Sequence, residues 1–167
     1  MRSSATPIVI AIIVALATAC SSSTEQARDD AQGQASQRAA DFQQSLAAAL
    51  SGVEPAARDA RTLQMLVRHK TKHETVVRHT STPTSADVLI AFTSGGTAGG
   101  GLTYGGATVV ACFDTIATWE AVTQTAVTCP PDGTDIPDGV QFAPVASGTA
   151  VANVGNPTCY GEDCPGG

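Results

Sequence analysis

The chain has 167 residues and a formal net charge of −6, and all nine of its Lys and Arg residues lie at or before Arg78. This length suits one modest domain. An acidic chain is repelled by phosphates, so the charge excludes nucleic acid as a partner and argues against binding to an anionic lipid surface by charge alone. Aromatic residues are scarce, with four Phe, two Tyr and one Trp, so we expect a core built mainly from Val, Ile, Leu and Ala.

A short apolar segment stands near the N-terminus, after Arg2. Residues 7–17 form an uncharged run of 11 residues, which is too short to span a bilayer but typical of the central region of a signal peptide. Small residues at 17–19 then lead into Cys20. These residues resemble the lipobox of bacterial lipoproteins, with one departure, because Ala17 stands where that family usually has Leu.

The resemblance implies that residues 1–19 are a signal peptide that is removed. It also implies that the thiol of Cys20 carries a lipid with acyl chains such as palmitate, on the outer face of a membrane. Residues 20–24 would then be a polar, flexible tether. The alternative is an ordinary secretory signal, since Ala17 and Ala19 also fit its small-x-small cleavage site. Both interpretations cut before Cys20 and export the chain; they differ in whether it stays attached.

Two helices are expected next. Residues 24–50 are rich in Ala, with Thr24 as a candidate N-cap and apolar residues at helical spacing in the second half. The polar first half, residues 25–38, is expected to fray or to extend away from the body. A second helix is expected over residues 56–67, after Pro55 in its first turn.

Four segments rich in β-branched residues follow, and they predict strands at residues 75–80, 86–93, 107–118 and 122–128. The glycine-rich stretch 94–106 is expected to be a long, mobile connection. It lacks the following helix that a phosphate-binding loop requires, although such a loop is a candidate binding element.

The predicted fold is therefore α+β, with N-terminal helices packed on a three- to four-stranded antiparallel sheet in a domain spanning residues 25–131. Residues 132–167 are expected to be a mostly irregular tail, with room for one short strand around residues 140–145.

The chain has five cysteines, an odd number. Lipidation of Cys20 would account for one of them, and export would leave the other four in an oxidising compartment where disulfides persist. Cys159 and Cys164 are close enough to close a small local loop, which leaves Cys112 to pair with Cys129.

A hairpin that turns between residues 120 and 121 would place Cys112 directly opposite Cys129, within disulfide reach. The rival uses of these cysteines are metal binding and redox chemistry. Their spacing matches no zinc pattern and contains no C-x-x-C motif.

Histidines provide the alternative function. His69 and His73 are four residues apart, so a helix would place them on one face, and His79 is nearby. This is a common arrangement for metal ligands, and it would suit a metal-binding or enzymatic accessory protein. Basic neighbours such as Lys70 would repel a cation, so we expect a solvated basic stretch there, with no metal and no cofactor. The stretch 68–79 is more simply paired with the chain's own acidic residues than with an anionic envelope partner.

No recognised catalytic motif occurs in the chain; G-x-S-x-G, for example, is absent. Residues 75–131 are similar in composition to small secreted proteins of high-GC Gram-positive bacteria, with a Val-rich strand at Cys112, the Cys129-Pro130-Pro131 ending, and seven Arg against two Lys. That resemblance implies no activity. We expect a lipid-anchored extracytoplasmic protein with a non-catalytic binding or structural role, and with an unidentified envelope or cell-wall partner.

Overall fold

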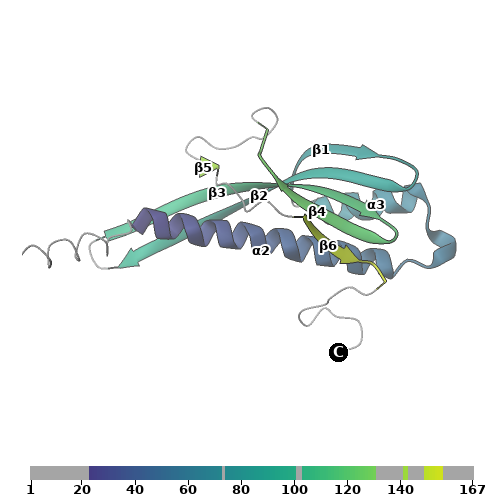
Figure 1. The fold of residues 1–167 in the computed structure, drawn as a ribbon, viewed down its shortest axis with the longest axis horizontal. Coiled ribbons are helices and arrows are strands. Elements are labelled where there is room, and N and C mark those ends of the chain that lie inside the picture. Colours follow the sequence, from purple (N-terminus) through teal and green to yellow (C-terminus); the bar gives the residue numbers. More distant parts are fainter. Residues whose placement is uncertain (1–22, 73, 101–102, 131–140, 143–148, 156–167) are drawn as a thin grey trace, which may run out of the picture.

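The computed structural model describes residues 23–72, 74–100, 103–130, 141–142 and 149–155 (Figure 1). Helices come first along the chain and the sheet follows, which confirms the predicted α+β class. The helical part comprises α2 (Ser23–Ser51), a short 3-10 turn η1 (Pro55–Ala57) and α3 (Ala60–Thr71). Helix α2 lies along one face of the sheet for its whole length (Figure 1).

Five strands form the antiparallel sheet, in the spatial order β1-β2-β3-β4-β6. Their bounds are Thr75–Ser81 (β1), Ser85–Gly100 (β2), Thr103–Thr118 (β3), Ala121–Val127 (β4) and Thr149–Asn153 (β6). A two-residue strand, β5 (Gln141–Phe142), pairs in parallel with β3. The four predicted strands are confirmed as β1 to β4, and the sheet has one more antiparallel strand than expected.

Strand β6 falls in the range that was expected to be mostly irregular, and β5 falls within the short strand considered there. β6 pairs with β4 along its whole length. Its alternation is hard to see in the sequence because the buried position is the small Ala152, while Val151 is 58% exposed. The hydropathy of this segment therefore lacks the period-2 signal on which strand prediction depends.

The second helix begins later than predicted, for a local reason. Pro55 opens η1 rather than α3, and the side chain of Asp59 caps α3 by accepting a hydrogen bond from the backbone N–H of Thr62 at 2.7 Å. This hydrogen bond also holds the pKa of the Asp59 carboxyl below its usual value. The cap satisfies one of the N–H groups that every helix start leaves unpaired.

The main core lies between α2 and the sheet. Alternate residues of β2 point toward the helix, and Phe92 packs between Phe42 of α2 and Phe113 of β3, with ring centroids 5.8 Å apart in both pairs. Such tilted aromatic pairs contribute roughly 0.5–1.5 kcal/mol each beyond the area they bury. Helix α3 adds Leu63 and Val67 to the same cluster.

One buried amide fixes the position of α2 over the far edge of the sheet. Gln43 is only 3% exposed. Its side-chain N–H groups donate to the backbone oxygens of Val122 at 2.8 Å and Ala150 at 2.9 Å, on β4 and β6. Because a buried amide is costly unless it is hydrogen-bonded, this pairing specifies both the depth and the rotation of the helix.

The first half of α2 is packed rather than frayed, which corrects the expectation for residues 25–38. Its contact face is a row of four alanines at every fourth position, each at most 1% exposed: Ala27, Ala31, Ala35 and Ala39. The helix already begins at Ser23, so Thr24 lies inside it and is not its cap, and the expected tether shrinks accordingly. Polar residues dominate this half, and alanine has too little hydropathy to mark the buried face.

Residues 94–100 and 103–106 of the glycine-rich stretch are strand and not loop, which corrects a second expectation. Strands β2 and β3 stay paired out to Gly100 opposite Thr103. A Cβ added to Gly96 would stand 1.9 Å from the backbone oxygen of Ala27, and one added to Gly105 would stand 2.6 Å from the backbone nitrogen of Thr24. Glycine is normally depleted in strands, but here it lets the helix backbone approach the hairpin closely.

Candidate functional site

The disulfide between Cys112 and Cys129 is present, with an S–S distance of 2.02 Å and a Cα–Cα distance of 5.1 Å. The pairing was predicted correctly, but the register behind it was wrong by two residues. Cys112 lies opposite Val127, because the β3–β4 turn is centred between residues 119 and 120. Cys129 follows the end of β4 and reaches back to Cys112 from beyond the ladder.

This bond belongs to a second, smaller apolar cluster on the sheet face away from α2. Its buried members are Leu89, Ala91, Val110 and Cys112, with Val77, Val127 and Cys129 packed against them. Both faces of β2 and β3 are therefore covered by side chains near Cys112. The disulfide links the segment that follows β4 to β3. The role of Cys112 and Cys129 is structural.

The remaining predicted site residues are not brought together. Cys20, Cys159, Cys164 and His73 lie outside the described residues, so lipidation and the second disulfide stay predictions. His69 is exposed in the last turn of α3 and His79 is exposed on β1. Within the described part of the chain, no group of three or more His, Cys, Asp or Glu side chains is placed to hold a metal ion.

One basic residue of the stretch 68–79 does pair with acids of the chain itself. A guanidinium nitrogen of Arg78 lies 3.1 Å from Asp114 and 3.7 Å from Asp87, on three adjacent strands. Partial burial, followed by the hydrogen bond and negative charge of Asp87, raises the pKa of the Asp114 carboxyl above its usual value; Arg78 opposes this rise. The group resembles a structural ion pair shared by two carboxylates.

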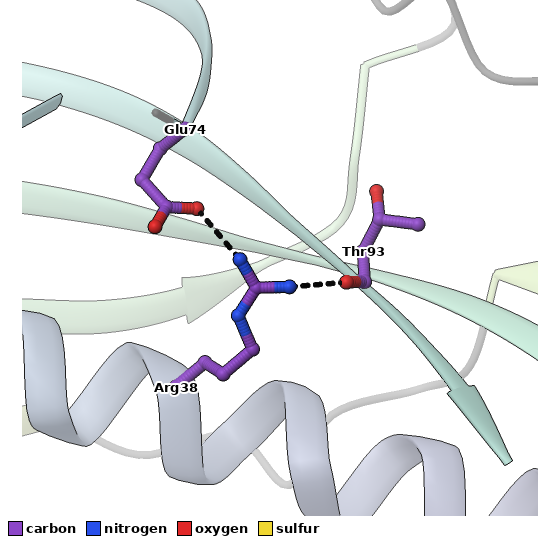
Figure 2. A network of polar contacts seen from close by, with 3 residues as sticks. All are labelled: Arg38, Glu74 and Thr93. Carbon is purple, nitrogen blue, oxygen red and sulfur yellow. Dashed lines mark hydrogen bonds and ion pairs between the residues drawn. The ribbon is translucent and has the colours of Figure 1, made fainter. Parts of the chain in front are cut away.

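A second polar network joins α2 to the sheet at the point where β1 begins (Figure 2). The side chain of Arg38 donates to the backbone oxygen of Thr93 at 2.6 Å and lies 3.4 Å from a carboxylate oxygen of Glu74. β1 pairs with β2 only as far as Ala91. Arg38 thus supplies a donor to β2 just beyond the last residue that β1 covers.

Beyond Arg38, the molecule narrows to an arm, in which α2 lies against a two-stranded hairpin (Figure 1). We define the arm as residues 23–35, 94–100 and 103–109. Its inner face consists of Ala27, Ala31 and Ala35 and of the hairpin residues that meet them, which are mostly small; Val109 packs against Ala31. Its outer face carries exposed threonines and Tyr104, which is 75% exposed.

A shallow groove of about 500 Å³ crosses the arm, lined by Thr24, Thr97, Thr108, Ala107 and three glycines. Its walls offer hydroxyl and backbone groups, with no ionisable side chain among the lining residues. Such a surface can make hydrogen bonds and close contacts, and it has no candidate nucleophile assisted by a base. The arm is the candidate functional feature of the chain.

Sequence reasoning missed the arm, although two signals for it are present. One is alanine at every fourth position from 27 to 39. The other is glycine at 96 and 105, two inward-facing positions of the hairpin. Each signal is weak alone, and only their match in space gives them meaning.

No described helix is both long and apolar enough to cross a membrane. Comparison of the chain with protein-family models, with curated proteins and with solved structures found no match.

Proposed function

We propose that this chain is a membrane-anchored extracytoplasmic lipoprotein with a non-catalytic binding or structural role in the cell envelope, attached through Cys20. The observation that carries the proposal is the short distance between the proposed anchor and the folded body. Helix α2 begins at Ser23, and a chain of three residues spans at most about 11 Å. The lipoprotein-like signal at residues 7–20 is therefore followed almost directly by the packed helix α2.

The arm suits the role of a spacer. Helix α2 has 29 residues, which corresponds to a length of about 43 Å at 1.5 Å per residue. The anchor would stand at the thin end of this arm, and the wider end carries α3, β1, the three-phenylalanine cluster and the disulfide (Figure 1). The part of α2 that lies in the arm, residues 23–35, corresponds to about 20 Å at 1.5 Å per residue, so an upright arm would hold that head roughly 20 Å from the lipid anchor.

Attachment would depend on the acyl chains alone. Buried methylenes contribute about 0.8 kcal/mol each, and stable anchoring needs two acyl chains or one chain with a basic patch. Near the anchor, the arm carries Arg28 among the acids Glu25, Asp29 and Asp30, so its charge adds no attraction to anionic lipid. Removing the acylated thiol should thus release the whole protein.

The test is metabolic labelling with an alkyne fatty acid in a bacterial host, followed by membrane fractionation. The full chain should incorporate label and sediment with membranes. The Cys20→Ser variant should lose both properties, and the neighbouring Ser22→Ala variant should keep them. Intact mass of the extracted protein should correspond to a chain that starts at Cys20 and carries acyl groups. An unlabelled protein, or a Cys20→Ser variant that remains on the membrane, would contradict the proposal.

A further inference from the structure

We infer that the tip of the arm, which we define as Gly99, Gly100, Thr103 and Tyr104, lies in the headgroup layer of the membrane that holds the chain, so that the arm stands upright on the bilayer. This inference rests on the proposed lipid anchor at Cys20 and names the surface that the arm contacts.

Geometry brings the hairpin tip to the anchor. An added Cβ on Gly105 would stand 2.6 Å from the backbone nitrogen of Thr24 and 2.7 Å from the backbone carbon of Ser23. The start of α2 and the hairpin end are therefore in contact, and β2 and β3 extend past the start of the helix (Figure 1). Since Cys20 is at most about 11 Å from Ser23 along the chain, a lipid on that cysteine keeps the tip within reach of the bilayer surface.

The chemistry of the hairpin suits this layer. No charged residue occurs between Asp87 and Asp114, so no charge must leave water when the tip enters the headgroups. Backbone groups between β2 and β3 are paired out to Gly100 and Thr103. Tyr104, next to the last pair, is 75% exposed, and tyrosine favours the membrane interface because its ring is apolar and its hydroxyl is polar.

The side of the arm is a poorer membrane surface than its tip. The outer hairpin face presents threonines and glycines between Thr93 and Thr108, which offer little apolar area. The solvent side of α2 carries Asp29, Asp30 and Asp41 among its exposed residues. Contact through the tip alone avoids placing either surface against lipid.

Trp119 provides an internal control for the test. It is the sole tryptophan of the chain, and it follows the end of β3 that is opposite to Tyr104. Fifteen residues of strand correspond to about 50 Å at 3.3 Å per residue. Acylated mature protein, starting at Cys20, is reconstituted into vesicles of phosphatidylcholine and phosphatidylglycerol that include a phosphatidylcholine with a nitroxide on its headgroup, which quenches tryptophan near it. Wild type, Tyr104→Trp and Thr108→Trp are compared, and flotation reports attachment.

We expect wild-type emission to be unchanged by the headgroup-labelled lipid, the Tyr104→Trp reporter to lose most of its added emission, and the Thr108→Trp reporter, about 13 Å farther along the strand, to lose much less. Equal losses at both reporters would mean that the arm lies flat and would overturn the inference. So would an unquenched Tyr104→Trp reporter in protein that floats, which leaves the anchor intact. Acylated protein that fails to float contradicts the anchor itself, and the inference falls with it.

Discussion

Substituting Gly96 with alanine should separate the helix from the hairpin. The new Cβ would stand 1.9 Å from the backbone oxygen of Ala27 and 2.7 Å from the backbone nitrogen of Ala31. Ordinary van der Waals contact begins near 3.4 Å, so the helix must move away by about 1.5 Å. Both atoms are backbone, and no side-chain rotation can relieve the overlap.

The expected cost follows from what this movement undoes. Overpacking a tight interior typically costs 1–3 kcal/mol, and a backbone collision places Gly96→Ala at about 3 kcal/mol or above. Gly95→Ala is the matched control, because the neighbouring position faces outward and its nearest atom, the oxygen of Ala107, is 3.9 Å from the new Cβ. There, lower entropy of the unfolded chain should give a change of at most about 1 kcal/mol, in the stabilising direction.

Two measurements distinguish a loss of global stability from local undocking of α2. Urea unfolding of the mature chain reports global stability, and amide hydrogen exchange of residues 24–35 reports whether the first half of α2 stays docked. We expect Gly96→Ala to lower the free energy of unfolding or to accelerate exchange in this segment, with Gly95→Ala close to the parent in both. If Gly96→Ala matches Gly95→Ala in both measurements, the close helix–hairpin contact is refuted.

Three further changes test the head. Removing the disulfide through Cys112→Ala and Cys129→Ala should lower the free energy of unfolding by about 3 kcal/mol, because the bond closes a loop with a sequence separation of 17; urea unfolding measures this, and no change would contradict it. Gln43→Leu should lower the free energy of unfolding by about 1–3 kcal/mol, because two backbone oxygens lose their donor. Urea unfolding measures this change as well, and a stabilised variant would refute the role of Gln43 in fixing the position of α2. For Asp114, burial and Asp87 raise the folded-state pKa above the usual 3.8, so its ionisation lowers stability as pH rises through that raised pKa. Asp114→Asn should therefore have a higher free energy of unfolding than the parent near neutral pH, and this difference should fade below pH 3.8. A variant that is less stable at neutral pH would show that the contact between Asp114 and the guanidinium of Arg78 dominates.

The head of the molecule is readable from the sequence because its signals are strong. Strands β1 to β4 follow runs of β-branched residues, and the second half of α2 repeats Phe42, Leu46 and Leu50 at helical spacing. The disulfide was predicted from cysteine spacing even though the assumed register was two residues out. The disulfide forms despite the different register because Cys129 follows the end of β4, where the backbone is no longer in strand geometry.

The arm is hidden from the same reasoning because its contact surfaces are made of residues with little hydropathy or strand propensity. Alanine is buried on one side and glycine on the other, so the helix looks polar and the hairpin looks like a loop. What stabilises this contact is close approach of two backbones, which gains dispersion contacts along the whole interface. A match between small residues on two separate segments, α2 and the β2–β3 hairpin, cannot be detected by a pattern search that considers one segment at a time.

Large apolar residues could also have joined α2 to the β2–β3 hairpin, so the presence of small residues there has a physical consequence. Larger side chains would widen the separation to the usual helix–sheet distance and give the arm an apolar surface at its rim, exposed near the proposed membrane contact. Small residues keep the arm thin, and among the described residues of the tip Tyr104 is the large exposed side chain. The hairpin of the arm, beside Ser23, carries no charged residue, so its end would enter between headgroups with little desolvation cost, while the charged outer side of α2 would remain in water. The composition that conceals the arm in the sequence is thus the composition that suits the proposed upright spacer on a membrane.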